Sequence, residues 1–474
     1  MLALRTQEVD RLKKSAPFVA ALAVTALVTG CTAQAGTGSP SDTAASSAGA
    51  NTTQAKLDAY CESRPADPSG TKPDPGDPNL SGTVTIWGWY PTPGDAVIKE
   101  FNKLYPKVTV KQETFGLDDV PTKLKTALLS GTGAPDASML EDRKAPQIAG
   151  NGLLDLTKCV GPYATDFPAA KMKKVTDGQG RITAVPWEAG PLLLSYRRSI
   201  FTQYGIDAAA IKTWDDFIAA GKKLDVASGG KVKMIFSNIQ AVPNSAFVTP
   251  DQVFQALTQE NGGQLFDDKA ATSISKDQAT AALEVMKKLR DAGVTLNDSG
   301  SANAEVAAVK EKRVATSFST PGAIFFLQGS VPDTKGDWGA IPVPVFAAGG
   351  NSGTNVGGTS FAVTDQNKSP EATWAFLRYW LLTVPGRTTS YKAGLLFENL
   401  FVPASKDPFF QQGDPFYNGQ VITDLYAKSA AAAPAFNEGA TLPALNRAFY
   451  GDVAKFYEGS ISASDFVANM QSAG

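Results

Sequence analysis

Apolar and polar residues alternate with two distinct periods from residue 82 onward. The stretches "TVTIWGWY" and "KVTVKQETF" have the β-branched, aromatic and alternating character of strands, and "APDASMLED" predicts a third, shorter strand. Between them, "PGDAVIKEFNKLYP" and "VPTKLKTALLSG" have helical spacing, and Gly131 ends the second helix. This alternation predicts a parallel sheet built from βαβ units, in which ligands bind beyond the carboxyl ends of the strands.

The same pattern continues through the rest of the chain. We expect two strands around a turn in "RITAVPWEAGPLLLSYRR", and a strand, a glycine-rich turn and a strand in "DWGAIPVPVFAAGGNSGTNVGGTSFAVT". Thr213 caps a helix in "TWDDFIAAGKKLDVAS", Gly293 ends a helix in "KDQATAALEVMKKLRDAG", and Ser369 caps one in "SPEATWAFLRYWLLT". The C-terminal part reads as helical.

The N-terminus has the pattern of a secretory signal. Basic residues precede an apolar run over residues 16–28, which is too short to span a membrane. Small residues then lead to Cys31 in "LVTGC", which resembles the lipobox of bacterial lipoproteins; the alternative is an ordinary signal peptide with a bystander cysteine. Residues 32–55 are nearly all small and polar, which predicts a flexible tether.

Composition excludes several classes of function. The 474 residues carry a net charge of −2 and contain no histidine, so no Ser-His-Asp triad and no histidine-ligated metal is possible. No basic field for nucleic acid is visible, and we expect no cofactor. If Cys31 is lipidated, Cys61 and Cys159 remain as a pair, which indicates a disulfide in an oxidising compartment; two separate thiols are the alternative.

Eight pieces in order resemble one family. They are "TVTIWGWY", "GAPDASMLED" with "GNGLLDLT", "ITAVPW" with "SYRRSIFTQYGID", "TWDDFIAAGKKL", "NGGQLFDD", "DWGAIPVPVF", "GGTSFAV" and "ATWAFLRYWLLT". The chain from Gly82 to Met470 is similar to the extracellular solute-binding proteins of ABC importers, in the sugar-binding family 1 that includes maltose-binding-protein-like members. The resemblance implies an α/β, two-lobed, type II periplasmic-binding-protein-like fold with three crossovers between the lobes.

The resemblance also suggests boundaries. We expect crossovers near residues 186–194, 337–344 and 385–395. The expected parts are a signal peptide over 1–30, a lipidated cysteine and tether over 31–81, an N-terminal lobe from 82–187 with 341–388, and a C-terminal lobe from 188–340 with 389–474.

The candidate ligand residues lie at strand ends and crossovers. A sugar needs aromatic plates for its apolar faces and planar polar groups for its hydroxyls. The resemblance carries over the Asp142-Arg143 pair and the neighbours Trp187 and Glu188. The alternative for Asp142 and Arg143 is a surface ion pair. For Trp87 and Trp89 the alternative is core packing, and for the glycines it is a tight turn. Gly322 stands where the family often has a stacking tryptophan, so Phe325 or Trp338 is a possible substitute. The full candidate set is Trp89, Tyr90, Glu113, Glu141, Asp142, Arg143, Trp187, Glu188, Asn244, Asn355, Gly357, Gly358, Glu398 and Asn446, with Trp87 as a further candidate.

The expected function is sugar capture for import. A monomeric, lipid-anchored protein on the outer face of the cytoplasmic membrane, in a Gram-positive cell, would bind a mono- or oligosaccharide between its lobes and deliver it to the permease subunits. The alternatives are a polyamine, phosphate-ester or iron ligand, and a secreted glycosidase that uses two carboxylates such as Asp142 and Glu188.

Overall fold

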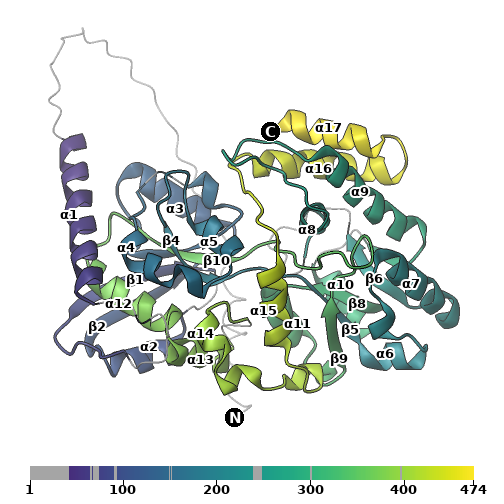
Figure 1. Ribbon diagram of the computed structural model, residues 1–474, viewed down its shortest axis with the longest axis horizontal. Helices are drawn as coiled ribbons and strands as arrows, with labels where there is room; N and C mark the ends of the chain where they lie inside the picture. The colour runs from purple at the N-terminus through teal and green to yellow at the C-terminus, as the bar shows by residue number, and fades with distance from the viewer. Residues whose placement is uncertain are drawn as a thin grey trace, which may run out of the picture. The chain divides into compact units, whose positions relative to one another are not determined.

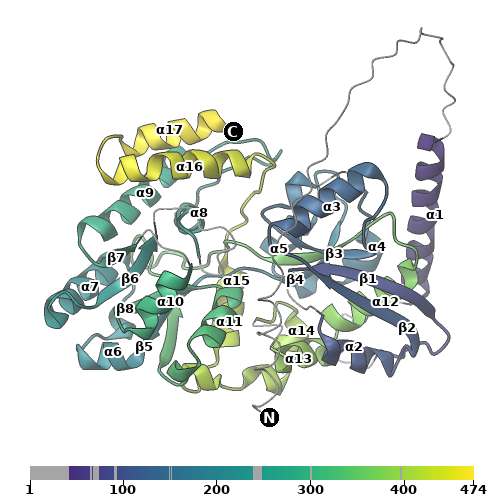
Figure 2. The same cartoon turned by 180° about the vertical axis from the view of Figure 1, so that it is seen from behind.

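The computed structural model describes residues 42–474 except 65–66, 68–73, 90–92, 149, 151, 239–247, 299–301 and 395–397. Within this described part, the strands form two five-stranded sheets. The first sheet has the order β2-β1-β3-β10-β4, and the second has the order β7-β6-β8-β5-β9 (Figures 1 and 2). The strands are β1 Ser81–Gly88, β2 Lys107–Thr114, β3 Ala137–Glu141, β4 Ala184–Glu188, β5 Leu193–Arg197, β6 Lys233–Asn238, β7 Thr295–Asp298, β8 Val314–Ser319, β9 Trp338–Pro342 and β10 Thr359–Val363.

Helices connect and cover these strands. Most of the helices predicted from the sequence are present, and Thr213 forms a capping box with Asp216 at the start of α7. The helices are α1 Asp42–Ser63, α2 Asp95–Asn102, α3 Asp119–Ser130, α4 Thr157–Val160, α5 Ala169–Val175, α6 Arg198–Gln203, α7 Trp214–Ser228, α8 Pro250–Glu260, α9 Lys276–Asp291, α10 Ala302–Lys310, α11 Pro321–Ser330, α12 Pro370–Leu381, α13 Val384–Lys392, α14 Val402–Ser405, α15 Ile422–Ala432, α16 Leu442–Tyr457 and α17 Ala463–Ala473. None of the helices in the described residues is long and apolar enough to cross a membrane.

The sheets are mixed rather than purely parallel. β1 pairs in parallel with β2 and β3, and β6 pairs in parallel with β7 and β8, as βαβ units require. β10 runs antiparallel to β3 and β4, and β5 runs antiparallel to β8 and β9. These two strands are the ones that enter a sheet from the other sheet, so they arrive in the opposite direction. The parallel pairing expected from the βαβ alternation is therefore confirmed for β1, β2 and β3, and the sheet is completed by an antiparallel strand.

Each sheet has an apolar core of its own. Ile86, Met139 and Phe361 lie in the first core, and Met234 and Phe254 lie in the second. A further cluster around Trp338 and Tyr426 packs against β5 and β9. The chain therefore folds as two α/β halves, which we call the first and the second half after their sheets.

The chain passes between the halves three times. The first passage is residues 189–192, between β4 and β5, and the second is residues 343–358, between β9 and β10. The third lies after Phe410, because Phe401 and Phe410 pack in the first core, whereas Phe416 packs in the cluster around Trp338. The expected third crossover at 385–395 is therefore too early, since residues 384–392 form α13.

Helix α1 is fastened to the first half. Gln54 exchanges hydrogen bonds of 2.8 and 2.9 Å with the backbone of Asp155, and Leu57 is buried in the first core. A disulfide joins Cys61 to Cys159, with a Cα–Cα distance of 5.2 Å, and confirms the pairing predicted from the cysteine count. The tether expected over residues 31–81 is therefore helical from Asp42 to Ser63 and docked near its end.

Candidate functional site

Asp142 follows β3 at the carboxyl edge of the first sheet and is 2% exposed. Its Oδ2 accepts a hydrogen bond from Lys171 Nζ at 2.6 Å, and its Oδ1 accepts one from Ser360 Oγ at 2.9 Å. Gly358, at φ +109°, passes so close that a Cβ there would lie 2.5 Å from Asp142 Oδ2. The two carboxylate oxygens therefore connect the end of β3 to α5 and to the neighbouring strand β10.

Arg143 reaches from the first half to the second. Its Nη2 lies 2.8 Å from Asp251 Oδ2 in the first turn of α8, and both side chains are buried. Asp251 Oδ1 also accepts hydrogen bonds from Thr249 Oγ1 and Tyr450 Oη, each at 2.6 Å. Burial would raise the pKa of Asp251, but the Arg143 guanidinium holds that pKa below its ordinary value. None of the residues that the structure describes forms a hydrogen bond with Arg143 Nε.

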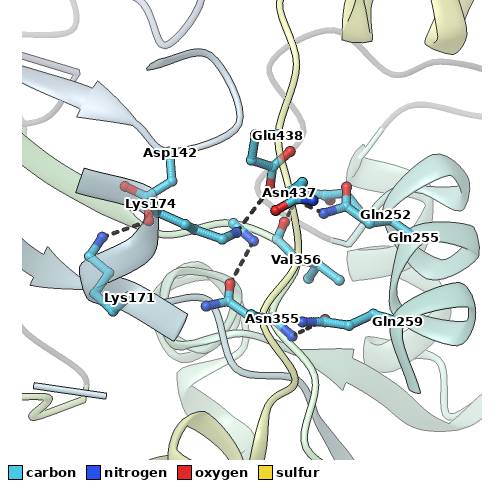
Figure 3. A network of polar contacts seen from close by, with 12 residues as sticks. Asp142, Lys171, Lys174, Gln252, Gln255, Gln259, Asn355, Val356, Asn437 and Glu438 are labelled. Atoms are coloured by element: carbon cyan, nitrogen blue, oxygen red, sulfur yellow. Dashed lines mark hydrogen bonds and ion pairs between the residues drawn. The ribbon is translucent and has the colours of Figure 1, made fainter. Parts of the chain in front are cut away.

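Lys174 on α5 makes a second contact between the halves. Its Nζ lies 2.9 Å from Glu438 Oε1, in the segment between α15 and α16 that passes between α5 and α8 (Figures 1 and 2). Figure 3 shows Lys174 extended toward Glu438, with three glutamines of α8 beside the linking segments. Gln255 Nε2 lies 3.4 Å from Glu438 Oε1, Gln252 donates to the second passage, and Gln259 donates to the α15–α16 segment.

A cavity of about 530 Å³ lies between the two halves at this network. Its volume is within the usual range of small-molecule sites. Asp142, Lys174 and Glu438 contribute polar groups to its wall, whereas Met172 and Phe436 contribute apolar surface. The remaining lining residues are Leu140, Ala145, Pro146, Leu153, Lys173, Thr176, Asp177, Gly178, Thr183, Asp267, Asp268, Lys269, Ala270 and Asn437.

Buried ionisable groups surround the first passage. Glu188 Oε1 accepts a hydrogen bond from Thr359 Oγ1 at 3.0 Å, and burial raises the pKa of Glu188 to about 7. Glu398 accepts the backbone N–H of Ala189; burial and the nearby Glu188 raise the pKa of Glu398 to about 8. Burial lowers the pKa of Arg387 to about 9, and this side chain donates to the carbonyls at the end of β4. Glu188 and Glu398, which are both predicted ligand residues, thus lie beside the first passage between the halves.

Two of the predicted aromatic residues are buried and one is exposed. Trp187 is buried in the first core, with ring-centroid distances of 5.6 Å to Phe361 and 6.1 Å to Trp380. Trp338 is buried in the second half, whereas Phe325 is 45% exposed on α11. Trp187 and Trp338 therefore present no open face to a ligand in this structure.

The predicted residues at the ends of β1 and β2 lie together. Trp87 Nε1 donates to Glu113 Oε2 at 2.9 Å, and its ring packs edge-on against Phe115 with a centroid distance of 5.2 Å. Trp89 is partly buried against the first core. Glu141 ends β3, and its Oε2 lies 3.2 Å from Lys144 Nζ. Because β1, β2 and β3 are parallel, the predicted residues at their carboxyl ends lie along one edge of the sheet.

The remaining predicted residues lie at the passages or outside the described part. Asn355 is buried, and its backbone N–H donates to Gln259 Oε1 at 2.7 Å. Gly357 follows it in the second passage, and Asn446 is half-buried on α16. Tyr90, Asn244 and Cys31 fall outside the described residues. The ligand roles of all these residues stay predictions.

Sequence reasoning missed the residues that pair with Asp142 and Arg143 and those that join the two halves beside them. Asp251 had one usable signal, because it stands in the first turn of a helix that "TPDQ" opens, where an acidic residue is favoured. Lys171, Lys174, Gln255 and Glu438 had none, since their partners are distant in sequence. Within the described residues, no cluster of three or more cysteine, aspartate and glutamate side chains could hold a metal ion.

Comparisons of sequence place the chain among binding proteins. It is 26% identical over 334 residues to the arabinooligosaccharide-binding protein of Halalkalibacterium halodurans, and the aligned region covers 68% of this chain and 71% of that protein. It is also 26% identical over 385 residues to the lactose-binding protein of Rhizobium radiobacter, and the aligned region covers 76% of this chain and 85% of that protein.

Solved structures share the fold. The GacH receptor of Streptomyces glaucescens, solved unliganded and with acarbose, superposes with a TM-score of 0.67 at 22% identity over 83% of this chain and 98% of that one. The sugar-binding protein MalE of Xanthomonas citri superposes with a TM-score of 0.68 at 16% identity over 82% and 96%. These likenesses confirm the two-lobed type II periplasmic-binding fold. The sequence model of one family matches residues 96–391, more than half of the chain, and the protein therefore belongs to the bacterial extracellular solute-binding proteins.

Proposed function

We propose that this protein captures an oligosaccharide between its two halves and delivers it to the permease of an ABC importer. The observation that carries the proposal is the convergence of carboxylate, ammonium and amide groups from both halves around the 530 Å³ cavity. Such groups bind vicinal hydroxyls in pairs. The relatives named for lactose and arabinooligosaccharides support a sugar rather than a charged solute.

The proposed mechanism is a shift between open and closed forms. A ligand that contacts both halves binds the closed form more tightly than the open form and so raises the closed population. The three chain passages are the hinges about which the halves move. The lobe boundaries proposed for this motion follow those expected from the sequence, except that the first lobe continues beyond residue 388 to Phe410.

Isothermal titration calorimetry with a ligand panel tests the function. We expect heat of binding with at least one of lactose, arabinooligosaccharides, β-1,6-galactobiose and maltooligosaccharides, and none with spermidine or glycerol phosphate. Trp89→Ala and Glu113→Gln should weaken the binding, whereas Glu311→Gln, an exposed acid paired with Arg313, should not. If the protein binds spermidine or a phosphate ester and none of the sugars, the sugar proposal is wrong and the alternative solute is the ligand.

The same mixtures test catalysis. As a transport protein the chain should release no product from the sugars that it binds, even after long incubation. A glycosidase would need two free carboxyls across the bond, but Asp142 is bonded to Lys171 and Ser360. Product release that Glu188→Gln abolishes would contradict the transport role.

The proposal includes a lipid anchor at Cys31 and a site outside the cytoplasm. Support comes from the apolar run that ends in "LVTGC" and from a family described as extracellular. Mass spectrometry of the mature protein, purified from membranes, should find a diacylated N-terminal cysteine. An unmodified N-terminus beyond residue 31 would refute the anchor and leave the binding function standing.

A further inference from the structure

Glu438 is the point at which three parts of the molecule meet. Its Oε1 lies 2.9 Å from Lys174 Nζ on α5 and 3.4 Å from Gln255 Nε2 on α8. The segment that carries Glu438 is itself held to the second half, since Phe436 packs in the second core and the Asn437 N–H donates to Gln264 at 2.8 Å. One carboxylate oxygen thus connects the first half to the second.

The Lys174–Glu438 pair is almost fully withdrawn from water. The side chains are 2% and 5% exposed. Removing one member of such a pair leaves a buried charge without a partner, and this costs far more than the loss of an exposed pair. Separation of the halves would expose both groups to water, so the pair favours the closed arrangement only while both charges are present.

The other oxygen of Glu438 has no partner among the described residues. In this part of the chain Glu438 Oε2 is buried without a hydrogen bond, as are Arg143 Nε and Gln255 Oε1 in the same network. A buried carboxylate oxygen without a donor is costly, so such a group calls for a ligand. Glu438 also lines the 530 Å³ cavity, together with Asn437 and Asp142. A sugar hydroxyl can donate to Oε2 and at the same time accept from a neighbouring N–H.

We propose that Glu438 contacts the ligand, with Oε2 accepting a hydrogen bond from a sugar hydroxyl while Oε1 holds the two halves together through Lys174. This inference rests on the proposed function and adds a specificity-determining residue to it. Because one carboxylate serves both contacts, the ligand hydroxyl is recognised only when the halves are closed. A sugar that lacks this hydroxyl leaves Oε2 unpaired and is rejected.

Glu311 supplies a matched control, because it is also a glutamate paired with a cation but does not line the cavity. Its Oε2 lies 2.6 Å from Arg313 Nε, and the side chains of Arg313 and Glu311 are 39% and 59% exposed. An exposed pair of this kind contributes little. Glu311→Gln should therefore leave sugar affinity unchanged, whereas Glu438→Gln should weaken it about tenfold or more, because the amide is a poorer acceptor and Lys174 loses its counter-ion.

Titration calorimetry of the wild type, Glu438→Gln and Glu311→Gln with the best-bound panel sugar and its monodeoxy analogues tests the proposal. We expect one hydroxyl whose removal weakens binding to the wild type but not to Glu438→Gln, a coupling that a purely structural role would not produce. Circular dichroism melting shows whether each variant is folded, and Glu438→Asp serves as the second variant if the first fails to fold.

The outcomes separate the two proposals. If the wild type binds sugars and no analogue shows coupling to Glu438, this inference is overturned and the transport function stands. If Glu438→Gln binds as tightly as the wild type, the inference is likewise overturned. If the wild type binds no sugar of the panel, the proposed function itself fails, and this inference fails with it.

Discussion

Asp142 forms a buried ion pair with Lys171, whose Nζ lies 2.6 Å from Asp142 Oδ2. Its place after a buried strand and before Arg143 predicts a polar site at the edge of the sheet, and the structure puts both residues there. Its partner Lys171 could not be predicted, because "AAKMKKV" has three lysines and only the tertiary fold decides which of them reaches Asp142. The sequence therefore predicts the charged residues of the site better than their pairing.

The buried pair makes Lys171 a stability determinant. Lys171→Met leaves the Asp142 carboxylate buried without its cation, so the free energy of unfolding should fall by about 3–5 kcal/mol in urea titration. Lys144→Met removes a partly exposed cation from Asp118 and Glu141 and should cost about 1 kcal/mol or less. Equal losses in the two variants would contradict the role of burial.

Glu398 makes stability depend on pH. Its pKa is about 8 in the folded protein against 4.5 for an ordinary glutamate, so the folded state holds a proton that the unfolded state has lost. This stabilisation is complete below about pH 4.5 and is lost as the pH rises through 8. The melting temperature of the wild type should therefore fall between pH 6 and pH 9 in calorimetric scans.

The variant Glu398→Gln separates this effect from the general titration of the protein. A glutamine keeps an acceptor for the Ala189 N–H but has no proton to lose. We expect its melting temperature to fall less than that of the wild type over the same range, by about 3 °C. Parallel pH profiles for the two proteins would assign the slope to other groups.

At the scale of elements, local patterns predicted most helices and strands correctly. Thr213 caps α7, Gly131 follows α3 in a left-handed conformation, and Pro370 opens α12 after Ser369, because each of these signals is local. The third passage was placed too early because nothing local marks it. Only the packing of Phe401 and Phe410 in the first core shows where the chain leaves that half.

The N-terminal element gives a prediction of its own. The Cys61–Cys159 disulfide closes a loop with a sequence separation of 98 and holds α1 against α4. Replacing both cysteines by serine should lower the free energy of unfolding by about 2–4 kcal/mol, as measured by denaturant titration. Sugar affinity should not change, since neither residue lines the cavity. A large loss of affinity would show that α1 also acts on the site.

At the scale of the whole molecule, two of the three passages lie backbone to backbone. The Val356 N–H donates to the Gly190 carbonyl at 3.0 Å, and Pro191 and Asn355 form an isolated antiparallel β-bridge. A Cβ on Gly190 would lie 2.8 Å from the backbone N of Gly357, which is closer than real contacts allow. The glycine at position 190 is therefore required by space, and the separation of the two hinge segments depends on it.

The matched pair Gly190→Ala and Gly357→Ala tests whether this close contact sets the hinge. Gly190→Ala should force the first and second passages apart, lower the melting temperature and weaken sugar binding, with a larger radius of gyration in X-ray scattering of the sugar-saturated protein. A Cβ on Gly357 meets nothing within 4 Å, so Gly357→Ala should melt and close like the wild type. Because Gly357 is also a predicted ligand contact, weaker binding by this variant at unchanged stability would support that contact. If Gly190→Ala binds sugar and contracts as the wild type does, the two passages are not coupled, and closure must depend on the third passage and on the ion pairs between the halves.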